Sequence, residues 1–294
     1  MRNIRTALRI SGIIILLSFI LSITTVNYLK LPNPVFLKNY IEADIAEGEN
    51  RYNLLNFDIE LKYISNIEDK RKVVGIIFDE APELNFNASE TNFEFARFYD
   101  YSNDNIENHG RYGIHTVFLN VDTSEQKIEI DDKLVLSKAT IFFDDGLSMK
   151  IDLGKIVLNK NNISETPLEN SGVEGSNYGY SKSIFWTKDY IQVDNIYSLL
   201  FEDTRDLFDF NINKTGDIED RSLIYNKNEN LYFVTQFHSI DDPIKKMYRY
   251  DIQPKIYFSD RDGNEYEKRV YNITHYPTFK FYDIYKYLRE VGEI

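Results

Sequence analysis

The stretch that decides the fold is ATIFFDDGLSMKIDL, residues 139–153, in which two runs rich in apolar residues flank Asp144, Asp145 and Gly146. An Asp-Gly pair between two such runs is the strongest short-range signal for a β-hairpin, because the tight turn needs backbone angles that glycine adopts freely. We therefore predict two antiparallel strands, at 139–143 and 148–153. Asp144 and Asp145 are interpreted as turn residues.

Strand signals of the same kind extend on both sides of this hairpin. Phe57, Ile59, Leu61 and Tyr63 alternate with polar residues, which is the period-two pattern of a half-buried strand. Further predicted strands cover residues 73–78, 115–121, 127–130, 134–143, 183–186, 190–193, 197–201, 231–237, 248–252, 255–259 and 265–273. Residues 282–291 have apolar side chains at helical spacing, so we predict a short helix there.

The two halves of this β-rich part show a weak similarity in the same order. GIIFDE (75–80) aligns with SLLFED (198–203), IHTVF (114–118) with FVTQF (233–237), and FFDDG (142–146) with FSDRDG (258–263). Any two β-rich stretches can align this well, which is the alternative to a duplication. Seven or so strands per roughly 100 residues is the scale of an immunoglobulin-like domain. We predict an all-β ectodomain of tandem immunoglobulin-like β-sandwiches.

An apolar run precedes the β-rich part. ISGIIILLSFILSITTV, at 10–26, contains no charged residue, and Arg2, Arg5 and Arg9 come before it. At ~1.5 Å per residue the run covers roughly 25 Å, and two further residues extend it toward the ~30 Å of a bilayer core. The arginines on its N-terminal side place that end in the cytoplasm. We predict a cytoplasmic tail at 1–9, a single transmembrane helix at 10–29, and a body outside the cytoplasm.

A cleaved signal peptide also has a basic start and an apolar middle, so it is the alternative to a retained anchor. The end of the run and the two residues after it, SITTVNY at 22–28, contain no pair of small residues of the Ala-x-Ala kind. The chain has no cysteine that could carry a lipid. We therefore predict a single-pass protein of the cell membrane with a retained anchor.

The remaining boundaries follow from shifts in composition. Residues 30–50 contain Pro32, Pro34 and the acidic run EADIAEGEN, and we interpret them as a stalk. Residues 159–182 are rich in Asn, Ser and Gly, which is typical of a linker or long loop. The predicted domains are therefore one β-sandwich at 51–158 and a second at 183–294, which includes the short helix.

Charge and composition exclude several classes of function. The chain has 47 acidic and 34 basic residues and a net charge of −13, so it repels phosphates, and neither a nucleic-acid nor an anionic-lipid partner is expected. Without cysteine it has no disulfides, thiolate zinc sites or cysteine nucleophiles. Its frequent Ile, Asn, Lys and Tyr resemble the composition of proteins from low-GC bacteria.

Signals for catalysis are weak. The histidines are scattered along the chain, without the spacing of a zinc site: His109, His115, His238 and His275. No nucleophile elbow, phosphate-binding loop or dinucleotide fingerprint is present in the sequence. We predict no catalytic residue, no cofactor and no enzymatic activity. The alternative is a surface carbohydrate hydrolase, for which Asp79, Glu80 and Glu83 are candidate carboxylates.

One acidic turn is a weak candidate for a calcium site. Asp260, Asp262 and Asn264 surround Gly263 in DRDGN, and Ca²⁺ prefers six to eight oxygen ligands. An EF-hand loop needs further acidic positions and a closing glutamate, and a hairpin turn already explains Asp-Gly. A calcium-stiffened adhesion or spacer protein is the corresponding alternative function.

Together these features predict a membrane-anchored binding or assembly module outside the cytoplasm. The anchor predicts the cytoplasmic membrane as one partner. An integral membrane protein or a cell-wall component is the expected second partner. The module would then be an accessory subunit of a membrane protein or of a cell-envelope complex.

Overall fold

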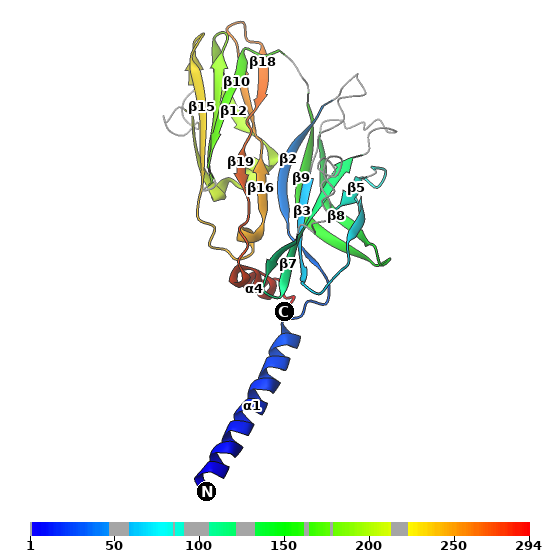
Figure 1. Ribbon diagram of the computed structural model, residues 1–294. Coiled ribbons are helices and arrows are strands. Elements are labelled where there is room, and N and C mark those ends of the chain that lie inside the picture. The colour runs from blue at the N-terminus through cyan, green and yellow to red at the C-terminus, as the bar shows by residue number, and fades with distance from the viewer. Residues whose placement is uncertain are drawn as a thin grey trace, which may run out of the picture.

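The computed structural model describes residues 2–46, 59–84, 86–90, 106–121, 133–161, 165–176, 179–212 and 223–294. Figure 1 shows a long helix, α1 (Arg2–Tyr28), that projects from a body built mostly of β-strands. Within α1, the segment Ile10–Tyr28 is long and apolar enough to cross a membrane, and none of it is buried. The residues predicted as a tail continue this helix without a break from Arg2.

Nine strands build the first sandwich in the ranges that the structure describes. Their bounds are β1 (Val35–Phe36), β2 (Asn39–Ala46), β3 (Ile59–Asn66), β4 (Val73–Phe78), β5 (Phe86–Ser89), β6 (Ile106–His109), β7 (Tyr112–Val121), β8 (Lys133–Phe143) and β9 (Ser148–Asn161). Neighbouring strands follow the order β1-β3-β7-β5-β4-β8-β9-β2, with β6 beside β7. Among the described residues, Ile76 and Phe86 form the pair that links β4 to β5. Side chains from β3 and β7 and from β4, β8 and β9 are buried together in one core.

The described residues of the second sandwich form two four-stranded sheets. Its strands are β10 (Leu168–Gly175), β11 (Tyr180–Thr187), β12 (Ile191–Tyr197), β13 (Phe208–Ile212), β14 (Leu223–Tyr225), β15 (Asn230–Phe237), β17 (Lys255–Ser259) and β18 (Glu265–Arg269). One sheet has the order β10-β11-β15-β13 and the other β14-β12-β17-β18. Two short helices, α3 (Leu199–Asp203) and η1 (Arg205–Leu207), connect β12 to β13.

Both sandwiches have the strand order of an immunoglobulin domain, in which strands A, B, E and D face C, F and G. In the first, β1-β3-β7-β5 correspond to A, B, E and D, and β4-β8-β9 to C, F and G. In the second, β10-β11-β15-β13 and β12-β17-β18 take the same places. The prediction of tandem immunoglobulin-like sandwiches is confirmed by this topology.

The alignment of the two halves matches structure at two of its three places. Residues 114–118 and 233–237 both lie on E strands, and 142–146 and 258–263 both lie at the turn between F and G. The third pair sets β4 against α3, because the matching strand β12 ends before Ser198. The predicted strand at 197–201 is therefore wrong. Ser198 caps α3 instead, since its Oγ accepts a hydrogen bond from the amide of Phe201 (3.1 Å).

Burial follows the period-two pattern that the strands predict. In β11 the side chains alternate between buried and half-buried positions along the whole strand. The first core contains Leu61, Phe78 and Ile156 from three different strands, and the second contains Phe185, Phe233 and Phe258. Truncating one such side chain to alanine typically costs about 2–5 kcal/mol.

The two sandwiches are joined by a shared sheet. β16 (Arg249–Ile252) pairs in parallel with β2, and β19 (Ile273–His275) pairs with β16. Both strands come from the chain of the second sandwich, yet they extend the sheet of the first. β2 also lies against β9, where Gly154 has a φ of +89° and a Cβ would meet the Asn39 carbonyl oxygen at 2.5 Å. Only glycine fits this approach.

The predicted stalk at 30–50 is wrong for the part that the structure describes. β1 and β2 occupy it, and Phe36 and Ile41 enter the first core. The acids that suggested a solvated segment alternate with apolar residues in YIEADIA, and long-range partners hold two of them. The prolines and acidic residues led to the prediction of a stalk, although the alternation of apolar and acidic residues is that of a strand.

The predicted linker at 159–182 is also wrong, because β9 reaches Asn161 and β10 spans Leu168–Gly175. β10 pairs with β11 through its backbone, while most of its side chains are exposed, so its composition is that of a loop. The predicted C-terminal helix is present as α4 (Phe281–Glu290). Residue 57 and the predicted strand at 127–130 lie outside the described residues.

Candidate functional site

The end of α1 is fixed to the first sandwich by side chains of β3 and β7. Asn66 accepts a hydrogen bond from the Leu31 amide at Oδ1 (3.0 Å) and donates to the Leu31 carbonyl from Nδ2 (2.7 Å). Tyr112 donates its hydroxyl hydrogen to the Leu29 carbonyl (2.7 Å), and Arg111 donates to the carbonyl of Val26 in the last turn (2.6 Å). Carbonyls at a helix C-terminus lack partners within the helix, and a guanidinium there also complements the helix dipole.

An apolar cluster lies beneath these bonds and includes α4. It joins the chain after α1, the ends of β3 and β7, and the short helix η3 (Lys245–Met247). Its buried members are Leu31, Leu37, Ile64, Tyr112, Ile114, Met247, Ile284, Tyr287 and Leu288. We call this region, with Asn66 and Arg111, the helix junction.

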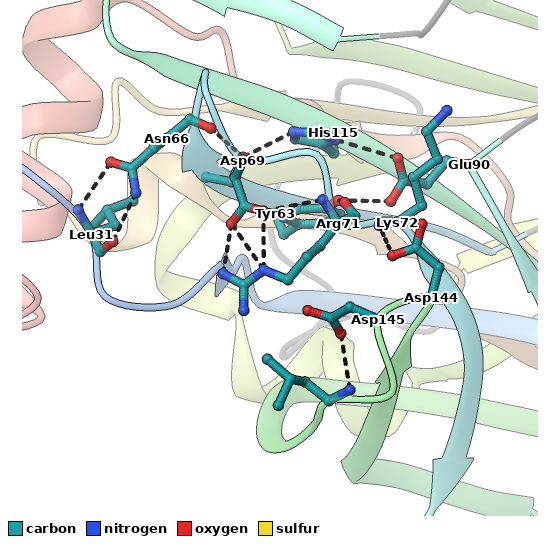
Figure 2. Close-up of polar contacts among 12 residues, drawn as sticks. Leu31, Tyr63, Asn66, Asp69, Arg71, Lys72, Glu90, His115, Asp144 and Asp145 are labelled. Atoms are coloured by element: carbon teal, nitrogen blue, oxygen red, sulfur yellow. Dashed lines mark hydrogen bonds and ion pairs between the residues drawn. The ribbon is translucent and has the colours of Figure 1, made fainter.

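A buried polar network continues from the helix junction along the same two strands (Figure 2). Ser65 Oγ lies 3.0 Å from Nε2 of His115, and Nδ1 of that ring lies 3.3 Å from Oε2 of Glu90. Tyr63 donates to Oε1 of Glu90 (2.7 Å), and the amide of Val73 donates to the same oxygen (2.9 Å). The Ser65 hydroxyl also donates to the Asn66 carbonyl (3.1 Å), and the tautomer of His115 sets which atom donates in its contacts with Ser65 and Glu90.

The order hydroxyl, imidazole, carboxylate is that of a catalytic triad, but its setting does not suit catalysis. Ser65 is 1% exposed and His115 3% exposed, so a substrate carbonyl has no access to Oγ. The Tyr63 ring stacks on His115 with centroids 4.4 Å apart. Burial, with the charge of Glu90, raises the pKa of Tyr63 far above its ordinary range. The network therefore holds strands β3 and β7 to the segment around Glu90.

Asp69 and Arg71 form an ion pair at the edge of this network (2.6 Å). Hydrogen bonds from Arg71 lower the pKa of Asp69 below its ordinary value of 3.8. Asp144 and Asp145 lie nearby in Figure 2, where they accept hydrogen bonds from the amides of Lys72 (3.1 Å) and Leu147 (2.9 Å). They order the β8–β9 turn, as the sequence predicted.

A second set of buried charges lies where the sandwiches meet. Glu42 on β2 is 1% exposed and accepts hydrogen bonds from Ser198 Oγ (2.8 Å) and from the amides of Leu200 (3.2 Å) and Gln253 (2.8 Å). Asp44 pairs with Arg269 at 2.7 Å. Burial raises the pKa of Asp44, although the Arg269 guanidinium opposes this shift. Each of these pairs joins residues more than 150 positions apart in sequence.

The weak calcium candidate is a hydrogen-bonded turn. Asp260 Oδ1 accepts from the amides of Asp262 and Asn264 (both 2.9 Å), and Oδ2 accepts from the Asn264 side chain (2.8 Å) and the Tyr266 hydroxyl (3.1 Å). The hydrogen bond from the Asn264 side chain is the main cause of the lowered pKa of Asp260. Both carboxylate oxygens therefore already stabilise the β17–β18 turn.

The candidate carboxylates of a hydrolase and the remaining histidines do not form a common site. Glu80 accepts from the Ser137 hydroxyl and the Lys138 amide, and these bonds outweigh burial and lower its pKa. Asp79 and Glu83 are exposed. His109, His238 and His275 lie on or next to different strands, and within the described ranges no three His, Asp or Glu side chains are grouped to hold a metal ion.

The residues of the helix junction and of the buried charges were missed in the sequence. Asn66, Tyr112, Glu90 and Arg269 each act through a partner at least 15 positions away. A single sequence carries no local signal for such pairs. Only the alternation around Glu42 and Asp44 could have identified that segment as a strand.

Comparisons with known proteins give no family. No family model and no curated protein matches this chain. Among solved structures, the YadV chaperone matches 81% of this chain and 98% of its own, with 9% identity and a TM-score of 0.24. The D00-D0 domain of intimin shows 7% identity and a TM-score of 0.19, and the match covers 81% of this chain and 98% of the intimin chain. Protocadherin gamma B7 cadherin domains 1–4 show 9% sequence identity and a TM-score of 0.20. That match covers 83% of this chain and 49% of the protocadherin chain. These scores carry no argument about function, so the immunoglobulin-like assignment rests on strand order.

Proposed function

We propose that this protein is a membrane-anchored binding or assembly module without enzymatic activity. α1 spans the cytoplasmic membrane with its N-terminus in the cytoplasm, and the two sandwiches stand outside. The body presents its surface to a second component of the envelope, either an integral membrane protein or the cell wall. Its net charge of −13 favours a partner surface that is basic or neutral.

The helix junction is the observation that carries this proposal. A flexible tether would leave the body free to turn on the membrane. Here both backbone groups of Leu31 are bonded to Asn66, and Leu31 lies only three residues after Tyr28, where the apolar segment of α1 ends. The shared sheet through β16 and β19 then ties the second sandwich to the first. A rigid body at a fixed height and orientation suits docking against another membrane component.

Topology can be tested directly because the chain has no cysteine. Single variants Asn3→Cys and Glu174→Cys are labelled in intact cells with a maleimide that does not cross membranes. The proposal expects label on Glu174→Cys, whose position on β10 is exposed, and label on Asn3→Cys only after permeabilisation. Label on neither before permeabilisation would place the body inside. The intact mass of the protein from membranes tests whether residues 1–29 are retained.

The partner is tested by cross-linking in the native membrane, followed by detergent extraction and mass spectrometry. Repeated recovery of one integral membrane protein supports an accessory subunit. Recovery of wall polymer instead supports a wall-binding module. Recovery of neither, with the protein intact in the membrane, contradicts the binding role.

A further inference from the structure

α4 is an amphipathic helix with an aromatic and basic outer face. Ile284, Tyr287 and Leu288 are buried in the cluster of the helix junction. The other exposed residues of α4 and its N-cap are mostly basic or aromatic, with one acid: Lys280, Phe281, Tyr282, Lys286, Arg289 and Glu290. Tyr282 is 62% exposed and Phe281 44%. Two large exposed aromatic rings on a short surface helix call for an explanation.

The position of α4 supplies one. Figure 1 shows α4 at the end of the body from which α1 emerges, beside the C-terminus. The Phe281 ring stacks on Tyr112 with centroids 6.1 Å apart, and the Tyr112 hydroxyl donates to the Leu29 carbonyl. A single side chain therefore separates Phe281 from the residue that follows α1. Tyr28, the last residue of α1, is exposed as well.

The charges fit a lipid headgroup region. Lys280, Lys286 and Arg289 are exposed on α4, and Lys286 lies 4.6 Å from the centre of the Tyr282 ring. The helix carries Asp283, but that carboxylate is paired with Lys246 (2.9 Å) and is only 17% exposed. Glu290, the last residue of α4, is exposed, and Glu293 lies just beyond the helix. The exposed surface of α4 therefore has three cations and two aromatic rings against one exposed acid, Glu290, whereas the chain as a whole is acidic.

We infer that the outer face of α4 lies in the lipid–water interface of the membrane that α1 spans, with Phe281 and Tyr282 among the headgroups. This inference rests on the proposed membrane anchorage. Aromatic side chains gather at that depth because they have an apolar ring and a polar edge, and cations on a polar flank are attracted to anionic lipid. α1 and α4 then form two points of attachment, which fix the tilt of the body.

The test uses added tryptophans in the full chain. Phe281→Trp, Tyr282→Trp, Ile20→Trp within α1, and Ile224→Trp on β14 of the second sandwich are reconstituted into bilayers of phosphatidylcholine and phosphatidylglycerol. Trp186 is the single natural tryptophan and gives the background in every sample. Quenching by brominated lipid is measured for each variant. All four positions are exposed, so the substitutions do not disturb a core.

We expect the tryptophans at 20, 281 and 282 to lose fluorescence and the tryptophan at 224 to keep it. Quenching at 20 without quenching at 281 or 282 overturns the interfacial role of α4 and leaves the anchor intact. Absence of quenching at 20 overturns the anchor, and the inference with it. Quenching at 224 as well would show a body lying flat on the bilayer, which contradicts an attachment restricted to α4.

Discussion

Glu42 shows how much depends on one buried carboxylate. Its oxygens accept hydrogen bonds from the N-terminal end of α3 and from the chain between β16 and β17, both in the second half of the sequence. Each donor would be left unpaired in a dry interior if the carboxylate were lost, and an unpaired buried donor costs about 1–3 kcal/mol. Glu42 therefore works as a cross-link between the sandwiches.

We predict that Glu42→Ala lowers the free energy of unfolding by about 3 kcal/mol or more. Urea denaturation of the full chain in detergent micelles measures it. The matched control is Glu174→Ala, because Glu174 is exposed on β10 and its contact with Lys182 at 3.3 Å is a surface pair. Surface pairs contribute about 0–1 kcal/mol. Equal losses in both variants would contradict the buried role of Glu42.

Asp69 gives a prediction in pH. Its folded pKa is held below 3.8, mainly by the hydrogen bonds from Arg71. A carboxyl group with a lowered pKa adds stability above its unfolded pKa and loses it as the pH falls through the folded pKa. We expect the urea midpoint of the wild type to fall below about pH 4, and Asp69→Asn to lack this part of the fall. If the urea midpoints of the two proteins fall in parallel as the pH is lowered, this prediction is contradicted.

At the scale of elements, local patterns predicted most strands and missed those held by distant partners. The hairpin of β8 and β9 could be predicted because Asp144, Asp145 and Gly146 lie between two apolar runs. β10 was not, since an edge strand with exposed side chains has the composition of a loop. β2 was taken for a stalk because the partners of Glu42 and Asp44 lie more than 150 positions away. The helix junction could not be predicted either, because its residues also contact partners that are distant in sequence.

The attachment of α1 leads to a prediction about amide exchange. Asn66→Ala removes the acceptor of the Leu31 amide and the donor to its carbonyl. Since a lost buried hydrogen bond costs about 1–3 kcal/mol, exchange at Leu31 should accelerate by roughly tenfold or more. Hydrogen exchange with mass spectrometry on the peptide containing Leu31 measures this. Asn230→Ala, at an exposed asparagine, is the control and should leave that peptide unchanged.

The β17–β18 turn leads to a prediction about calcium. Asp260 has both oxygens engaged with donors of its own turn, so binding Ca²⁺ there would require breaking those bonds. A ligand that binds the folded state raises Tm, and one that does not bind leaves it unchanged. We expect millimolar Ca²⁺ to leave the Tm of the protein unchanged. A Ca²⁺-dependent rise in Tm that is lost in Asp262→Ala would contradict this expectation and support a calcium site in the turn.

At the scale of the whole molecule, the shared sheet determines whether the body behaves as one unit. β16 and β19 belong by sequence to the second sandwich and by pairing to the first. Tyr250 on β16 is buried in the second core, and its ring stacks on Tyr40 of β2 with centroids 5.4 Å apart. Interfaces between domains of one chain are commonly small and mobile. A continuous sheet with buried charges is a stronger connection.

We therefore expect the full chain to unfold in a single transition, with equal calorimetric and van't Hoff enthalpies. Tyr250→Ala removes a ring that both sandwiches contact, and we expect the transition to separate into two. The control is Tyr197→Ala, since that ring is on β12 of the second sandwich and is exposed. Two transitions in the wild type would mean that the shared sheet does not couple the sandwiches. The fixed orientation on which docking against a membrane partner depends would then extend only to the first sandwich.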